Sequence, residues 1–139
     1  MSQRIHAIAP TLPVADVATA VEDYVSQFGF IRVFDNAPVF AMVERDGIRI
    51  GLQRRNEGNL GPSSIYIWVE DVRAMYEELK ATGVKVKKKP KQQTEYDLTD
   101  FVVFDRDNNH IGFGGKESII CGSGMARNLN SWKKRSHTR

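Results

Sequence analysis

The stretch of the sequence richest in potential metal ligands is "DRDNNHIGFGG", residues 105–115. Asp105, Asp107 and Asn109 alternate as oxygen ligands do in the first half of a calcium loop, and His110 follows them directly. An EF-hand loop also needs a glycine at its sixth position and a bidentate glutamate at its twelfth. Those positions hold His110 and Lys116. We therefore interpret the Asp and Asn residues as turn formers, whose short side chains bind their own backbone.

Composition narrows the classes of protein to which the chain can belong. It has 139 residues, of which 41% are hydrophobic and 27% charged, as expected of one globular domain. The sequence contains no apolar run long enough to cross a bilayer, no signal-peptide core at its start, and a single cysteine. We expect a cytoplasmic protein that makes no membrane contact.

The positive charge of the chain is unevenly distributed. The net charge is +3, but residues 117–139 hold five basic side chains and one acidic one, which leaves 15 basic and 16 acidic in residues 1–116. This nearly neutral body argues against nucleic-acid binding. The exception is "VKVKKKPK", residues 84–91, which we interpret as a solvated strand and loop, with an anion or partner site as the alternative.

The predicted helices and strands, which position any functional residues, follow an internal repeat. "LPVADVATAVEDYVSQFGF" and "IWVEDVRAMYEELKATGV" each place a strand before a helix that begins after an aspartate, Asp16 or Asp71, and ends at a glycine. Three strand-like segments follow each helix, and the repeats end alike in "RIGLQ" and "HIGFG". The sequence therefore predicts two tandem βαβββ modules, about 5–55 and 63–116, joined by a linker rich in Gly, Asn and Pro at about 56–62.

Three segments, "PTLPVADVATAVEDYVSQFGF", "IYIWVEDVRAMYEELKATGV" and "VVFDRDNNHIGFGG", together resemble the vicinal-oxygen-chelate superfamily. That superfamily includes glyoxalase I, extradiol dioxygenases and bleomycin-resistance-type proteins, and the resemblance covers about residues 5–116. It implies an α+β fold in which the two modules form an open, cleft-lining mixed sheet with helices on the outer face. It also implies one glyoxalase/bleomycin-resistance-like domain over 1–116, followed by a basic C-terminal extension over 117–139.

The resemblance also indicates where a metal ion would be bound. In metal-dependent members, a histidine precedes the helix-capping aspartate by seven residues, and a glutamate lies in the last strand of the module. The matching residues here are Ala9, Gly51, Ser64 and Gly112. Alanine and glycine side chains cannot bind a metal, and a serine hydroxyl alone would not hold a divalent ion. We therefore expect no metal and no other cofactor, as in the metal-free bleomycin-resistance-type members.

The residues that share a face with these positions are the candidate ligand-binding residues, because alternate side chains of a strand point the same way. Tyr66 and Trp68 could stack on a planar ligand or simply cover the sheet or a dimer contact, and Arg49 could pair with a carboxylate or phosphate. His110 is a candidate acid-base residue, with a role as a hydrogen-bonding wall residue as the alternative. The full candidate set is Thr11, Arg49, Gln53, Ser64, Tyr66, Trp68 and His110.

The resemblance implies a metal-free homodimer that sequesters a small organic molecule. Arg49 and the basic pI of about 9.1 favour an aromatic, neutral or anionic ligand over the cationic drug bleomycin. Two alternatives stay open. One is a metal-independent lyase- or isomerase-type enzyme that uses His110 as its acid-base group, and the other is a partner-binding protein that acts through residues 117–139.

Overall fold

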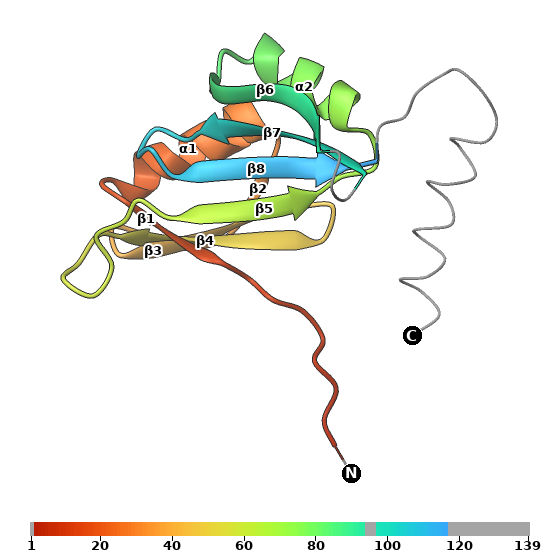
Figure 1. The fold of residues 1–139 in the computed structure, drawn as a ribbon. Helices are drawn as coiled ribbons and strands as arrows, with labels where there is room; N and C mark the ends of the chain where they lie inside the picture. Colours follow the sequence, from red (N-terminus) through yellow and green to blue (C-terminus); the bar gives the residue numbers. More distant parts are fainter. Residues whose placement is uncertain (1, 94–96, 117–139) are drawn as a thin grey trace. The chain divides into compact units, whose positions relative to one another are not determined.

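The computed structural model describes residues 2–93 and 97–116, and its elements follow the predicted repeat (Figure 1). Each half of the chain has one strand, one helix and three further strands, which confirms the two tandem βαβββ modules. The first module contains β1 (Thr11–Val14), α1 (Val17–Phe28), β2 (Ile31–Asn36), β3 (Phe40–Arg45) and β4 (Ile48–Arg54). The second contains β5 (Ser64–Trp68), α2 (Val72–Ala81), β6 (Lys85–Gln93), β7 (Leu98–Phe104) and β8 (His110–Gly115).

Each module builds a four-stranded sheet with the same strand order. The first sheet has the order β1-β4-β3-β2, and the second has the order β5-β8-β7-β6. In the first sheet β1 runs parallel to β4, whereas β3 is antiparallel to both β2 and β4, so the sheet is mixed. The first strand of each module therefore lies beside the last strand of the same module.

Both helices begin where the sequence predicts. The Asp16 carboxylate accepts a hydrogen bond from the Thr19 backbone N–H at 3.0 Å, and Asp71 accepts one from Ala74 at 3.1 Å. Such side-chain caps satisfy backbone donors that the first turn of a helix leaves unpaired. Gly29 ends α1 with a left-handed backbone (φ 75°) that favours glycine.

Alternation along the strands divides the residues of each sheet between a core face and an open face. In the first module Leu12, Val43 and Leu52 are fully buried together with the apolar side of α1. In the second module Phe101 and Phe113 stack at 5.2 Å between ring centroids, and the buried residues of α2 are Val72, Tyr76 and Leu79. The opposite faces of the sheets carry the predicted ligand-binding residues.

The contacts of the chain divide it into two compact units. The first unit contains the residues up to Ile65 together with Phe104–His110, and the second contains Tyr66–Val103 together with the residues from Ile111 onward. The turn between β7 and β8 therefore belongs with the first module in space, although it lies within the second module in sequence. None of the described helices is long and apolar enough to span a membrane.

Candidate functional site

The turn between β7 and β8 is built on a buried aspartate. Asp105 is 6% exposed, and one oxygen of its carboxylate accepts hydrogen bonds from the backbone N–H groups of Asp107 and Asn109, both at 2.9 Å. Asn108, between them, has a left-handed backbone (φ 64°), which Asn tolerates better than most residues. These bonds confirm that the alternating Asp and Asn residues form a turn through their own backbone.

The second Asp105 oxygen also accepts two hydrogen bonds. Its donors are the Tyr24 hydroxyl from α1 and the Asn109 side-chain amide, each at 2.9 Å. Burial and the negative charge of Asp105 raise the pKa of Tyr24 well above its ordinary value, so the phenol stays protonated and donates. With four donors on its two oxygens, the carboxylate has its hydrogen-bonding capacity filled by the protein itself.

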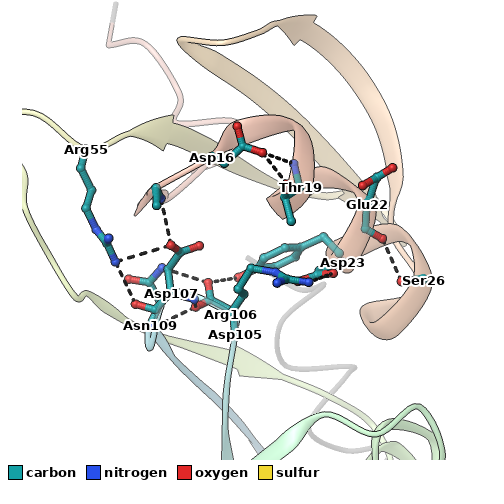
Figure 2. Close-up of polar contacts among 12 residues, drawn as sticks. Asp16, Thr19, Glu22, Asp23, Ser26, Arg55, Asp105, Arg106, Asp107 and Asn109 are labelled. Carbon is teal, nitrogen blue, oxygen red and sulfur yellow. Dashed lines mark hydrogen bonds and ion pairs between the residues drawn. The ribbon is translucent and has the colours of Figure 1, made fainter.

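Asp107 ties the turn to the start of α1. Its carboxylate accepts from the Ala15 backbone N–H at 2.9 Å and lies 3.5 Å from the Arg55 guanidinium, which also donates to the Asp107 carbonyl (Figure 2). The neighbouring Arg106 points outward and forms a two-bond ion pair with Asp23 of α1, the shorter bond being 2.7 Å.

Asn109 joins the turn to β1 and to the residue before β5. Its amide nitrogen donates to the Pro13 carbonyl at 2.9 Å, and its oxygen accepts from the Ser63 backbone N–H at 2.8 Å. Asn109 is completely buried, and every polar atom of its side chain is used. Residues 105–109, which resemble the start of a calcium loop in the sequence, therefore form a turn that holds segments of the first unit together.

The positions where metal-dependent relatives would carry ligands do not fit a metal ion. Gly51 is buried in β4, and a Cβ added there would lie 2.9 Å from the Phe40 ring and 3.0 Å from the Thr11 hydroxyl, so a larger residue would have to displace these side chains. Of the other three, only Ser64 has a side-chain oxygen. Across residues 2–93 and 97–116, no three His, Cys, Asp or Glu side chains form a group that could hold a metal ion.

The open face of the first sheet brings together three of the predicted ligand-binding residues. Thr11 is directly opposite Gly51 on the neighbouring strand, Gln53 is opposite Phe40, and Arg49 belongs to the same side of β4. Thr11 and Arg49 are exposed, and Gln53 is half-buried.

The sequence interpretation missed other residues of this face, among them Glu44, Phe40 and Phe34. The Arg49 guanidinium pairs with the Glu44 carboxylate directly across the strands, at 2.7 Å, so its charge is already compensated within the protein. The ring of Phe40 lies 6.1 Å from that of Phe34, between centroids. Strand alternation along residues 40–45 was the signal that could have placed Phe40 and Glu44 here.

The open face of the second sheet carries a pair of half-exposed aromatic side chains, Tyr66 and Trp68 on β5. Tyr66 is 43% exposed and Trp68 52%, and their rings meet edge to face with centroids 5.3 Å apart. The Tyr66 hydroxyl donates to the Asp100 carboxylate at 3.2 Å. A Cβ added at Gly114 would overlap that hydroxyl, so glycine at this position makes room for the tyrosine. We call Tyr66 and Trp68 the aromatic pair.

His110 and Ser64, the remaining candidates, lie in the first unit. The His110 ring is half-buried and packs edge to face on Phe104 at 5.2 Å, while its backbone N–H donates to the Ser63 carbonyl at 2.8 Å. Ser64 is exposed at the start of β5. The C-terminal extension over 117–139, proposed above as a partner-binding segment, lies outside the described residues.

Comparison with known proteins found a protein family that matches most of the chain. The family model described as "Glyoxalase/Bleomycin resistance protein/Dioxygenase superfamily" matches residues 4–113. A bleomycin resistance protein of Geobacillus stearothermophilus is 28% identical over 122 residues, which cover 75% of this chain and 92% of the relative. A bleomycin resistance protein of Staphylococcus aureus matches to the same extent.

Solved structures show the same fold at lower sequence identity. The bleomycin-binding protein of bleomycin-producing Streptomyces verticillus, in complex with copper(II)-bleomycin, matches with a TM-score of 0.70 at 23% identity, over 85% of this chain and all of that one. TioX from Micromonospora sp. ML1 matches with a TM-score of 0.69 at 18% identity, over 78% of this chain and 97% of that one.

Proposed function

Because the chain belongs to the Glyoxalase/Bleomycin resistance protein/Dioxygenase superfamily, we propose that it binds and sequesters a small organic molecule without a metal ion. The names of the bleomycin-resistance and bleomycin-binding relatives support a binding role. The side chains at the family's metal-ligand positions support binding without a metal ion. Ala9, Gly51 and Gly112 stand where metal-dependent members carry ligands, and they offer no side-chain donor atom. The observation that carries the proposal is the aromatic pair, which is exposed and in which Tyr66 is held by Asp100.

The aromatic pair suits the planar face of an aromatic ligand. Both residues are about half exposed, and a stacked or edge-to-face contact with a ligand ring contributes about 0.5–1.5 kcal/mol beyond the burial of area. Asp100 and Gly114 hold Tyr66 in one position, so little side-chain freedom is lost on binding.

We propose a neutral or anionic ligand, with neutral ligands as the first choice. An anionic group would have to share the Arg49 guanidinium with Glu44, which already pairs with it at 2.7 Å. The Arg49–Glu44 pair is exposed and screened by solvent, so competition from Glu44 lowers the affinity for an anionic group only modestly. Bleomycin, the drug that the relatives' names specify, belongs among the test compounds.

We also propose that the protein is a homodimer. Support comes from β2, the edge strand of the first sheet, where every residue is exposed and Ile31 and Phe34 are 61% and 51% exposed. Apolar side chains gathered along one strand are typical of a surface that another chain covers.

Tryptophan fluorescence tests the binding role directly. Trp68 and Trp132 are the two tryptophans of the chain, so a Trp132→Phe variant leaves Trp68 as the only reporter. We expect a panel of planar neutral and anionic aromatic compounds to contain ligands that quench Trp68 saturably in the presence of a chelator. The matched Trp68→Phe variant should lose both the signal and the affinity. Quenching that requires an added divalent metal would contradict the proposal.

Product analysis separates sequestration from catalysis. Each compound that binds is incubated with the protein and recovered by chromatography. Recovery of unchanged compound supports sequestration, whereas a product that disappears in His110→Ala would establish the metal-independent enzyme instead.

A further inference from the structure

Strand β6 concentrates positive charge on an otherwise acidic body. Its sequence, KVKKKPKQQ, contains five lysines, all of them exposed. Residues 1–116 hold 15 basic and 16 acidic side chains, so ten basic and sixteen acidic remain when these five lysines are set aside. A field of this kind attracts an anionic partner to one strand of the protein.

The lysines of β6 are regularly spaced. Lys85, Lys87, Lys89 and Lys91 occupy alternate positions and therefore project to one side of the strand, whereas Lys88 projects to the other. Alternate residues of a strand are about 6.6–6.8 Å apart, so these four side chains leave the backbone in a row with that repeat. We call Lys85, Lys87, Lys89 and Lys91 the lysine row.

The backbone of β6 is open along one side. β6 is the last strand in the order β5-β8-β7-β6, so β7 pairs with one side of it and no described strand pairs with the other (Figure 1). Such an edge presents backbone N–H and C=O groups that an extended chain can pair with, except at Pro90, which has no N–H.

From the row and the open edge together, we propose that β6 docks an extended acidic segment of a partner protein, which adds to the second sheet as a further strand. A strand with Asp or Glu at alternate positions has the same repeat as the lysine row, so each carboxylate lies beside a lysine. Backbone pairing then provides affinity, and the charge pattern selects the segment. Lysine and proline on an edge strand oppose its pairing with other strands, and the carboxylates of an acidic segment offset the lysine charge that does so.

The composition of β6 favours a peptide over a nucleic acid. Proteins that bind single-stranded nucleic acid combine basic side chains with aromatic ones on which the bases stack. β6 contains five lysines and no aromatic residue. The lysine row therefore offers charge and spacing but no stacking platform.

Fluorescence anisotropy with a labelled peptide of alternating Glu and Thr tests the proposal. The comparison probes are a peptide of the same composition with its Glu and Thr in two blocks, and an oligothymidine of equal charge. The full-length protein should bind the alternating peptide more tightly than both. Equal binding of the block peptide, tighter binding of oligothymidine, or no binding of the alternating peptide at low salt would each overturn the proposal.

Two neighbouring lysines provide the matched variants. Lys89→Gln removes a charge from the row, and Lys88→Gln removes the same charge from the other side of the strand. We expect Lys89→Gln to weaken binding of the alternating peptide by about two- to fivefold, and Lys88→Gln to weaken it by less than about twofold. The triple variant Lys87→Gln, Lys89→Gln, Lys91→Gln should weaken binding of this peptide by about 8- to 125-fold, the product of three such effects. Equal effects of Lys88→Gln and Lys89→Gln would overturn the proposed geometry, and thermal melts confirm that each variant is folded.

Discussion

Asp105→Asn tests the structural role of the turn between β7 and β8. The substitution keeps the shape of the side chain but replaces one acceptor oxygen with an NH₂ group, which only donates. If the NH₂ group replaces the oxygen that binds the backbone, it faces the N–H groups of Asp107 and Asn109. In the other orientation it faces the Tyr24 hydroxyl, which can rotate to accept, and the Asn109 amide, which cannot.

The second orientation costs less free energy. It still loses the hydrogen bond from the Asn109 amide and brings two NH₂ groups into contact. Asn109 cannot relieve this by turning its amide over, because its oxygen accepts from Ser63 and its nitrogen donates to Pro13. A hydrogen bond to a charged group contributes about 1.5–3 kcal/mol, a neutral one about 0.5–1.5, and a buried unpaired donor costs about 1–3. Neutralising a buried carboxylate recovers part of this loss, so we expect a net destabilisation of about 2–4 kcal/mol.

Urea unfolding followed by far-UV circular dichroism measures this change as a difference in the free energy of unfolding. Asp46→Asn is the matched control, because the Asp46 side chain is 87% exposed and asparagine tolerates its left-handed backbone (φ 51°). The control should stay within about 0.5 kcal/mol of the wild type. If Asp105→Asn is no more destabilising than Asp46→Asn, the reasoning about the turn is refuted.

Three further substitutions test the buried turn, the aromatic pair and the proposed dimer. Tyr24→Phe should cost about 1.5–3 kcal/mol near neutral pH, because its hydroxyl donates to a buried carboxylate. The raised pKa of Tyr24 means that the unfolded chain loses this proton first, so wild-type stability should fall by about 1.4 kcal/mol per pH unit above about pH 10. The difference in free energy of unfolding between the wild type and Tyr24→Phe, measured with urea, should therefore shrink above about pH 10. A difference that stays constant with pH would contradict the burial of Tyr24. Gly114→Ala should displace Tyr66 from Asp100 and weaken the ligand affinity measured by Trp68 quenching by about two- to tenfold. The free energy of unfolding should change by less than about 1 kcal/mol, because the exposed ring can swing outward. Undiminished affinity would show that Tyr66 does not bind the ligand. Phe34→Glu should convert the proposed dimer to a monomer in light scattering with no loss of helix signal, and a wild-type monomer would reject the dimer.

The sequence predicted the fold because the features that define it are local and repeated. Asp16 and Asp71 mark both helix starts, and Gly29 marks the end of α1. Alternation of side chains then placed Leu12 and Val14 in the core and Tyr66 and Trp68 on the open face.

The parts that the sequence did not predict depend on contacts between distant segments. Tyr24 fits the apolar side of α1, and nothing near it in the sequence indicates that its hydroxyl binds Asp105, 81 residues away. Glu44 and Arg49 are only five residues apart, but their pairing follows from the register of the β3–β4 hairpin. Arg49 was therefore predicted as an available cation, whereas the structure pairs it within the protein.

Native mass spectrometry shows whether the protein binds a small organic molecule without a metal ion. The protein is treated with a chelator, exchanged into ammonium acetate, and incubated with the compounds that quench Trp68. We expect complexes whose added mass is that of the organic compound alone, formed equally with and without the chelator and lost in Trp68→Ala. Complexes that form only with a stoichiometric divalent metal ion would contradict this expectation.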